Sequence, residues 1–285
     1  MKHETLISVE QLVSEQKSGS PLIVLDCSFE LTDVAAGRRT YEAGHIPGAV
    51  YLDLERVLSA EKTGKNGRHP LPTKEAFVQS MAALGLNDDT QVVAYDNAGG
   101  MYAARLWWML RWVGHAGAAV LDGGIEAWKQ AGLPLSTEAP AQAAKGQFSL
   151  RASLVDTIDY EGVKANIGSR QKQVLDARAP DRFRGENETL DPVGGHIPGA
   201  RNRLFKDNLA ADGRFKPATQ LRQEFDAITG GRPASEIISQ CGSGVTACHN
   251  LLAMEIAGLK GATLYPGSWS EWSAQPGAPI ATGAE

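Results

Sequence analysis

The stretch Cys241-Gly242-Ser243-Gly244-Val245-Thr246-Ala247 decides how this sequence is interpreted. It follows a strand-like run at 237–240 and precedes a helix-like run that begins near Ala247. A cysteine at such a junction faces the backbone N–H groups of the first helical turn, which have no partner inside the helix. Their partial positive charge favours the thiolate, which is the nucleophilic form of cysteine. Because the two glycines let the loop curl around the sulfur, we expect Cys241 to be a reactive thiol rather than a structural one.

Composition limits the classes of protein that this chain can represent. Its 285 residues suit two domains of ordinary size, and its net charge of −5 argues against a nucleic-acid partner. The longest apolar run, near 106–113, is interrupted by Arg111, so we expect no membrane association. Three cysteines without CxxC spacing predict neither a disulfide framework nor a zinc site. With no signal peptide visible, we expect a cytoplasmic location.

The chain contains an internal repeat. The motif HIPGA occurs at 45–49 and again at 196–200, and each copy follows an apolar run that ends in an aspartate, Asp26 or Asp176. A second apolar run, a Gly-rich turn and a Trp-bearing segment follow each copy in the same order. This spacing predicts two homologous domains, at 1–138 and 153–285, joined by an Ala-, Gln- and Pro-rich linker at 139–152.

Short Val, Ile and Leu runs alternate with helical patterns in both halves. This alternation predicts an α/β fold in which each domain is a mostly parallel sheet with helices on both faces. Functional sites in such sheets form beyond the carboxyl ends of the strands, which is where Cys241 is expected. Cys248 lies on an apolar helical stripe, which favours core packing over a redox role. Trp107, Trp108 and Trp112 are expected in the core or between the domains.

The first repeat has a different residue at the position of the cysteine. Aligning residues 92–93 with residues 237–238 places Asp96 opposite Cys241. Because a carboxylate can neither carry sulfur nor attack as a thiolate, we expect the first domain to be catalytically inactive.

The composition of the loop narrows the chemistry. A cysteine phosphatase requires an arginine at the position of Ala247, and a cysteine hydrolase requires a base beside the thiol. The nearby His249 is expected on the surface, facing away from the loop. Sulfur transfer remains: the thiolate attacks an activated sulfur and holds it as a persulfide, whose anion the N–H groups of residues 242–247 stabilise.

The doubled domain, the paired HIPGA motifs and CGSGVTA resemble the two-domain rhodanese family of sulfurtransferases, along nearly the whole chain. The resemblance implies an inactive first domain, a catalytic second domain and no cofactor. In this family CRKGVTA is typical of enzymes that use thiosulfate, and CG(S/A)GVTA of those that use 3-mercaptopyruvate. The neutral Gly242 and Ser243 therefore favour 3-mercaptopyruvate as the small-molecule donor. The implied acceptors are cyanide, small thiols or a thioredoxin-like protein.

The resemblance also implies roles for individual residues. Ser243 matches the serine of a Ser-His-Asp relay, His45 matches its histidine, and Asp33 is the nearest candidate for its aspartate. Arg182 matches the arginine that binds the donor carboxylate. The loop residues Gly242, Gly244, Val245 and Thr246 are expected to line the substrate.

One position departs from the family pattern. Enzymes that use 3-mercaptopyruvate usually have a second arginine nine residues after the first, where this chain has Asp191. Arg184, Arg201 or Arg203 could supply the missing cation. The departure keeps two alternatives open, a thiosulfate sulfurtransferase and a non-catalytic persulfide carrier.

Overall fold

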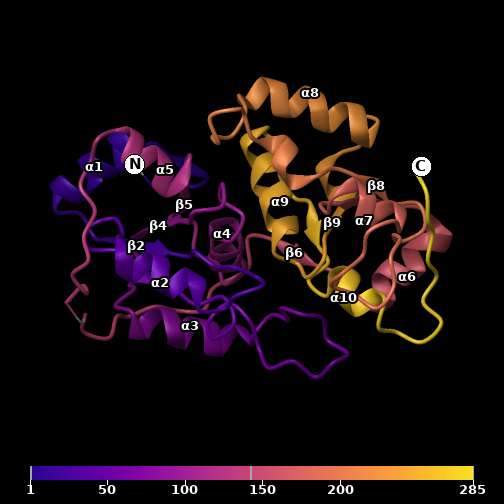
Figure 1. Ribbon diagram of the computed structural model, residues 1–285, viewed down its shortest axis with the longest axis horizontal. Coiled ribbons are helices and arrows are strands. Elements are labelled where there is room, and N and C mark those ends of the chain that lie inside the picture. The colour runs from indigo at the N-terminus through magenta and orange to yellow at the C-terminus, as the bar shows by residue number, and fades with distance from the viewer. Residues whose placement is uncertain (1, 142, 285) are drawn as a thin grey trace. The chain divides into compact units, whose positions relative to one another are not determined.

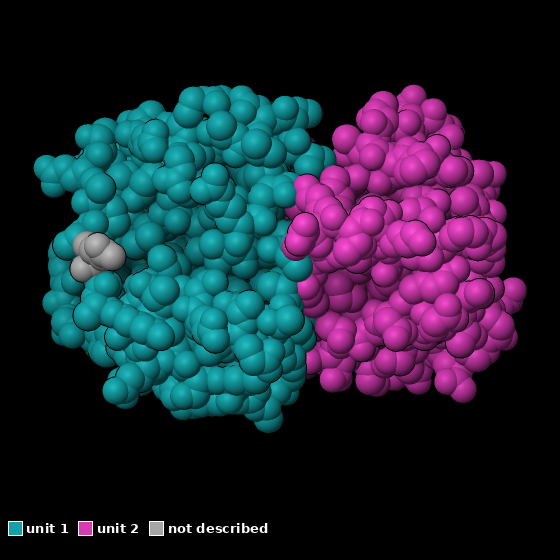
Figure 2. Space-filling model, turned by 90° about the horizontal axis from the view of Figure 1, so that it is seen from below, with its two compact units in different colours: residues 1–60, 72–154, 211–215 teal, residues 61–71, 155–210, 216–285 magenta. Residues whose placement is uncertain are grey.

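The structure is a computed structural model that describes residues 2–141 and 143–284. The chain forms two compact units, coloured separately in Figure 2. Unit 1 comprises residues 1–60, 72–154 and 211–215, and unit 2 comprises residues 61–71, 155–210 and 216–285.

Unit 1 contains a five-stranded sheet with the strand order β1-β5-β4-β2-β3, in which every pairing is parallel. Helices flank the sheet (Figure 1). The elements are β1 (Leu6–Ile7), α1 (Val9–Ser18), β2 (Leu22–Asp26), α2 (Ala36–Ala43), β3 (Val50–Tyr51), α3 (Lys74–Ala83), β4 (Gln91–Tyr95), α4 (Ala103–Trp112), β5 (Ala118–Leu121) and α5 (Gly124–Gln130).

Unit 2 repeats this topology with the strand order β6-β10-β9-β7-β8, again entirely parallel. The elements are β6 (Asp156–Thr157), α6 (Tyr160–Ser169), β7 (Gln173–Asp176), α7 (Pro180–Arg184), β8 (Arg201–Asn202), η1 (Phe205–Asn208), α8 (Ala218–Thr229), η2 (Ala234–Glu236), β9 (Ile237–Gln240), α9 (Thr246–Ile256), β10 (Thr263–Leu264) and α10 (Ser268–Trp272). The predicted fold class, two tandem α/β domains with parallel sheets, is confirmed.

Local sequence explains why these elements begin and end where they do. Ser8 caps α1 through a capping box with Gln11, and Asp159 caps the equivalent helix α6. The central strands β4 and β9 are buried along their whole length, as expected of strands covered on both faces.

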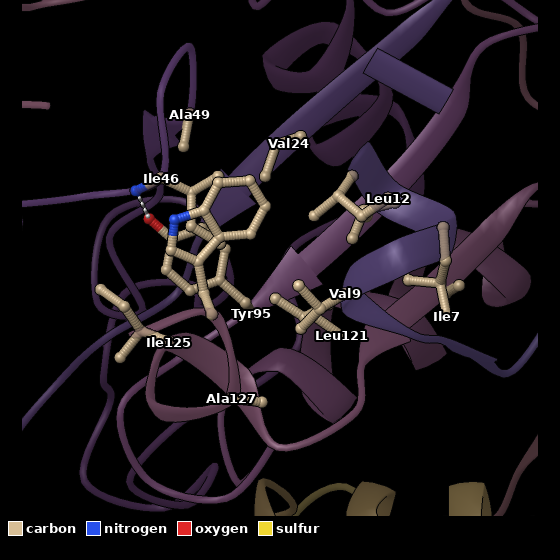
Figure 3. Close-up of a cluster of buried hydrophobic side chains, with 13 residues drawn as sticks. Ile7, Val9, Leu12, Val24, Ile46, Ala49, Tyr95, Leu121, Ile125 and Ala127 are labelled. Carbon is tan, nitrogen blue, oxygen red and sulfur yellow. Dashed lines mark hydrogen bonds between the residues drawn. The ribbon is translucent and has the colours of Figure 1, made fainter. Parts of the chain in front are cut away.

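Each unit has its own hydrophobic core. In unit 1, side chains from the sheet, α1 and α5 pack together, and the Tyr95 hydroxyl accepts a hydrogen bond from the Ile46 amide at 3.2 Å (Figure 3). In unit 2, Trp269 and Trp272 of α10 fill the corresponding space. Trp107 and Trp108 are fully buried in α4, where Trp108 stacks with Trp112. Among the described residues, no helix is long and apolar enough to cross a membrane.

The compact units differ from contiguous domains in two segments. Residues 61–71, here called the first arm, belong to unit 2, and residues 211–215, here called the second arm, belong to unit 1. The segment predicted as a linker, 139–152, includes residue 142, which lies outside the described residues. Part of this segment is attached to unit 1, since the amides of Gly146 and Arg151 donate to the carbonyls of Ala82 and Val113.

Candidate active site

The loop between β9 and α9 is fixed by the first two residues of α10, Ser268 and Trp269. The Cys241 amide donates to Ser268 Oγ at 3.0 Å, and the Cys241 carbonyl accepts from the Trp269 amide at 2.9 Å. Gly244 has a φ of +75°, and an added Cβ would lie 2.3 Å from the Pro266 carbonyl oxygen. Glycine is therefore required at position 244 for both its backbone angle and its lack of a side chain.

Cys241 is buried, with 1% of its surface exposed, and the loop that follows it carries several free amide groups. The backbone N–H groups of Gly242, Ser243, Val245, Thr246 and Ala247 have no hydrogen-bond acceptor among the residues that the structure describes. We call these five donors the amide cradle. A group of unpaired donors at the start of α9 is suited to an anion, because the helix adds its own partial positive charge.

The equivalent loop of unit 1 shows what such a loop binds. Strand pairing aligns Asp26 with Tyr95 and Asp176 with Gln240, so the residues that follow, Asp96 and Cys241, occupy equivalent positions. One oxygen of the Asp96 carboxylate accepts from the amides of residues 98 and 100 at 2.8 and 2.9 Å. The other oxygen accepts from the amides of residues 102 and 103, both at 2.8 Å. In unit 1 the loop therefore encloses an anion that belongs to its own chain.

Ser243 has a histidine partner that the sequence analysis did not identify. The Ser243 hydroxyl lies 2.7 Å from Nδ1 of His69, and both side chains are buried. His69 lies on the first arm, which belongs to unit 2. This contact gives the serine a partner that can accept or return a proton.

His45, the histidine predicted for that role, has other contacts. Its Nδ1 lies 2.8 Å from the Tyr41 carbonyl and its Nε2 lies 3.1 Å from the Glu138 carbonyl, while its ring stacks on Tyr41 at 3.9 Å. His196 of the second HIPGA motif repeats this arrangement, with Nδ1 at 2.8 Å from the Phe183 carbonyl and its ring stacked on Phe183. Both histidines therefore hold their own unit together in the same way.

Asp33 is not the partner of His45 either. It is half exposed at the start of α2, where its carboxylate forms an ion pair with Arg39 at 2.5 Å and accepts from the Ala35 amide. The pKa of Asp33 is lowered, chiefly by the hydrogen bond from Arg39. The described contacts of Asp33 are therefore local ones in the turn that precedes α2, and they do not include His45.

Two arginines converge on the loop beside Cys241. Arg182 of α7 donates from Nε and Nη2 to Glu188 at 3.0 and 2.9 Å, and from Nη2 to Asp191 at 3.1 Å. Burial raises the pKa of Glu188, but the hydrogen bonds and charge of Arg182, together with the amides of Leu190 and Asp191, lower it by more, so the net pKa is lowered. Arg68 of the first arm donates from Nη1 to the other oxygen of Asp191 at 2.8 Å. A Cβ added at Gly242 would lie 3.1 Å from Arg68 Nη2 and 3.8 Å from both Nη atoms of Arg182.

The three arginines considered as replacements for the missing cation have other partners. Arg184 pairs with Glu186 at the surface. Arg201 donates to the Ile228 carbonyl, and Arg203 forms an ion pair with Glu224. Arg68 is the arginine that the structure places with Arg182 on Asp191.

Two other side chains near the loop have structural contacts. His249 is fully buried, where its Nδ1 accepts from the Asn208 amide group at 3.2 Å, so the expectation that it lies on the surface is wrong. Phe205 and Asn208 of η1 cover His249, and the Phe205 ring lies edge-on to the His249 ring at 5.4 Å between centroids. Cys248 is buried and its thiol donates to the Gly244 carbonyl at 3.3 Å.

A weak sequence signal for the missed residues exists. Gly67-Arg68-His69 matches Gly213-Arg214-Phe215 in the second repeat, and each triplet lies on an arm that belongs to the other unit. Among the described residues, no group of three His, Cys, Asp or Glu side chains is placed to hold a metal ion.

Comparison with known proteins identifies the family. A profile of the rhodanese-like domain matches the chain twice, over residues 8–131 and 159–275. The chain belongs to the rhodanese family.

Relatives of this rhodanese cover its full length. It is 48% identical to the "Probable 3-mercaptopyruvate sulfurtransferase" of Pseudomonas aeruginosa, over 99% of this chain and 100% of the relative. It is 37% identical to human 3-mercaptopyruvate sulfurtransferase (93% and 89% covered) and 36% identical to mouse thiosulfate sulfurtransferase (95% and 92% covered). With such similarity to one class of enzymes, this rhodanese is a sulfurtransferase.

Solved structures agree with this assignment. The 3-mercaptopyruvate sulfurtransferase from Leishmania major matches with a TM-score of 0.84 at 29% identity, over 97% of this chain and 76% of that one. The Escherichia coli enzyme SseA, described as a 3-mercaptopyruvate sulfotransferase, matches with a TM-score of 0.79 at 30% identity, over 93% and 98%.

Proposed function

We propose that this rhodanese transfers sulfur from 3-mercaptopyruvate through a persulfide on Cys241 to cyanide, a small thiol or a thioredoxin-like protein in the cytoplasm. The observation that carries the proposal is the amide cradle beside Cys241, together with its counterpart around the Asp96 carboxylate. The same loop fold binds a fixed anion in unit 1 and contains a buried thiol in unit 2. Unit 1, with its loop already occupied, has no catalytic role in this proposal.

The reaction has two half-reactions. The Cys241 thiolate attacks the donor sulfur, and the carbon–sulfur bond breaks with its electron pair moving to carbon, which gives the enolate of pyruvate. The enolate takes up the proton that the donor thiol has released, so pyruvate leaves and Cys241 carries a persulfide anion. An acceptor nucleophile then attacks the outer sulfur and returns the Cys241 thiolate.

The amide cradle acts on the persulfide. Its N–H donors are fixed by the loop before the reaction begins, so they stabilise the outer sulfur anion without rearrangement as charge develops there. The buried surroundings strengthen this interaction, because water is excluded from the loop.

The Ser243–His69 pair handles the proton in this proposal. The hydroxyl of Ser243 is held 2.7 Å from His69 Nδ1, and it lies two residues after the sulfur nucleophile. A serine bonded to an imidazole can pass a proton between the donor thiol and the developing enolate. His69 therefore replaces His45 in the predicted relay, and Arg182 binds the donor carboxylate.

The choice of donor rests on the loop and on the relatives. The residues after Cys241 are neutral in 3-mercaptopyruvate enzymes and here, whereas a thiosulfate dianion benefits from two cations at those positions. The full-length relative at 48% identity carries the 3-mercaptopyruvate name. The presence of Arg68 and Arg182 beside Gly242 keeps thiosulfate as the second candidate donor.

A donor assay combined with intact-mass measurement tests the proposal. We expect wild-type protein to gain the mass of one sulfur atom from 3-mercaptopyruvate and to release pyruvate, with kcat/KM above that for thiosulfate. Cys241→Ser should show neither signal, whereas Cys248→Ala, a matched control at a buried thiol of the same unit, should retain both. A sulfur adduct that persists in Cys241→Ser would overturn the assignment of the nucleophile. A higher kcat/KM for thiosulfate would overturn the choice of donor.

A further inference from the structure

Arg68 and Arg182 share one carboxylate and face the same point of the catalytic loop. Asp191 accepts from Arg68 through Oδ1 and from Arg182 through Oδ2. The side chain of Asp191 is only 3% exposed, whereas the side chains of Arg68 and Arg182 are 19% and 18% exposed. Both arginines therefore meet at a partly open position, with Asp191 behind them.

Each guanidinium keeps donors that face away from Asp191. Arg182 uses Nε and Nη2 for Glu188 and Asp191, while Arg68 uses Nη1 for Asp191 and for the Leu190 carbonyl at 3.3 Å. Nη2 of Arg68 is the nearest atom to a Cβ built on Gly242, and the two Nη atoms of Arg182 are the next nearest. Because a guanidinium has five N–H donors in one plane, each arginine retains donors for a second anion on the side of Gly242.

The charges around this point are balanced before any ligand binds. Arg68, Arg178 and Arg182 are matched by Asp176, Glu188 and Asp191, through the ion pairs that link them. An anion that binds here is selected by directed hydrogen bonds rather than by an excess of positive charge. A planar carboxylate can accept from two guanidinium groups at once, as Asp191 already does from the opposite side.

We infer that Arg68 is the second carboxylate-binding residue for the sulfur donor, and that Asp191 is the positioning residue that holds Arg68 beside Arg182. The inference rests on the proposed function and specifies the donor as an α-keto carboxylate whose carboxylate bridges the two guanidinium groups. This chain therefore has no arginine at position 191, and the aspartate there binds Arg68 of the first arm, which takes the role of that arginine.

The test compares two donors that differ only in the carboxylate. In 1-mercaptopropan-2-one a methyl group replaces the carboxylate of 3-mercaptopyruvate. We expect Arg68→Gln to lower kcat/KM for 3-mercaptopyruvate by about 10- to 100-fold, mainly through KM, because a charged hydrogen bond to the ligand is lost. The same variant should change kcat/KM for 1-mercaptopropan-2-one by less than about twofold, since this donor has no group for Arg68 to bind.

A relocated arginine provides the rescue. In the double variant Arg68→Gln/Asp191→Arg the cation returns to position 191, and we expect kcat/KM for 3-mercaptopyruvate to recover at least about fivefold over Arg68→Gln. Arg222→Gln, at an exposed arginine of α8 that pairs with Asp226, is the matched control and should leave both donors unaffected.

Two results would overturn the inference. An equal loss with both donors would show that Arg68 supports the loop rather than the carboxylate, and an unchanged KM for 3-mercaptopyruvate would show that Arg68 does not contact the donor. Neither result coincides with failure of the proposed function, which would appear in the wild-type protein as an absence of pyruvate release. Thermal unfolding of each variant shows whether the fold is retained.

Discussion

His69 and His45 are both buried, but they have different hydrogen-bond partners, which indicates different roles. His69 bonds to a side-chain hydroxyl two positions after the nucleophilic cysteine, whereas His45 contacts only backbone carbonyls through its ring nitrogens. A histidine that alternates between proton donor and acceptor needs a partner that can change its own protonation or hydrogen bonding. The hydroxyl of Ser243 meets that need and the carbonyls around His45 do not.

Substituting each histidine by asparagine should separate the two roles. We expect His69→Asn to lower kcat for pyruvate release by about 100-fold or more, because general acid–base catalysis is lost. His45→Asn should lower the midpoint of thermal unfolding but keep kcat within about threefold per folded molecule. Steady-state kinetics together with calorimetry measure both. A larger kcat loss in His45→Asn than in His69→Asn would contradict this assignment.

At the scale of single elements, the loop between β9 and α9 depends on backbone conformation more than on side chains. Its donors are amides, and their direction is set where Gly244 takes a positive φ against the Pro266 carbonyl. The first two residues of α10 hold the loop through bonds to both backbone groups of Cys241. The chemistry of the loop is therefore sensitive to substitutions that remove no functional group.

Gly244→Ala tests this dependence. The added methyl group would lie 2.3 Å from the Pro266 carbonyl oxygen, so the loop must move and the donors lose their common direction. We expect sulfur loading of Cys241 to slow by about 100-fold, on the scale of losing a donor that stabilises a developing anion. Gly213→Ala, at a positive φ with no atom within 4 Å of the added methyl group, is the control and should load sulfur at the wild-type rate. Rapid-quench mass spectrometry measures loading directly, and normal loading in Gly244→Ala would exclude a fixed cradle.

Glu224 of α8 forms acid-sensitive ion pairs in unit 2 with Arg203, which lies just before η1, and with Lys216, which lies just before α8. Burial raises the pKa of Glu224, but hydrogen bonds from Arg203, Lys216 and Gln220 together lower it by more, so the net pKa is about 2. The unfolded chain has the ordinary value of 4.5, so it binds more protons than the folded chain between the two values. The stabilisation is complete above the unfolded pKa and is lost as the pH falls toward the folded pKa.

Urea unfolding at a series of pH values checks this prediction. Between about pH 5 and about pH 3 the free energy of unfolding should fall less steeply in Glu224→Gln than in the wild type, since glutamine does not titrate. Parallel curves for the two proteins over this range would show that Glu224 is not ion-paired in solution. Glu161→Gln, at an exposed carboxylate of α6, should behave as the wild type.

Much of the architecture could be predicted from sequence because repetition and hydrophobic runs are local signals. The apolar run that ends at Asp26 forms β2, residues 92–93 lie in β4, and the predicted cysteine loop lies between β9 and α9. The cation beside Cys241 and the partner of Ser243 could not be located in this way. Arg68 and His69 come from an irregular segment of the other repeat, and neither their periodicity nor their spacing indicates where that segment packs. The HIPGA motif could not show the contacts of His45 either. His45 and His196 occupy the same place in the two repeats, and both contact backbone carbonyls of their own unit.

At the scale of the whole molecule, the two repeats exchange equivalent segments. The first arm belongs to unit 2 and carries Arg68 and His69, while the second arm belongs to unit 1, where the Phe215 amide donates to Asp122 at 2.8 Å. In the proposed reaction, the site of unit 2 therefore includes residues from the first repeat, far earlier in the chain than the Cys241 loop. In this proposal the first repeat supplies Arg68 and His69 to that site, although Asp96 occupies its own position equivalent to Cys241.

Replacing residues 61–69 by a Gly/Ser segment of equal length tests this dependence. We expect kcat/KM for 3-mercaptopyruvate to fall at least as far as in an Arg68→Gln/His69→Asn double variant, because both side chains are removed together. Unit 1 should keep its thermal transition, since the arm is not part of its compact unit. Activity above that of the double variant would mean that the arm obstructs the site.

The carboxylate of Asp96 is in effect a ligand that can never dissociate. In the proposed reaction, the loop of Cys241 reaches the equivalent filled state only while sulfur is bound. An acceptor for these N–H donors should stabilise the surrounding backbone. We therefore expect protein with a persulfide on Cys241 to unfold at a higher temperature than protein with a free Cys241 thiol, and we expect cyanide, which removes the sulfur, to abolish the difference. Calorimetry would then measure how much one bound sulfur atom stabilises unit 2, with the unfolding of unit 1 as the internal standard.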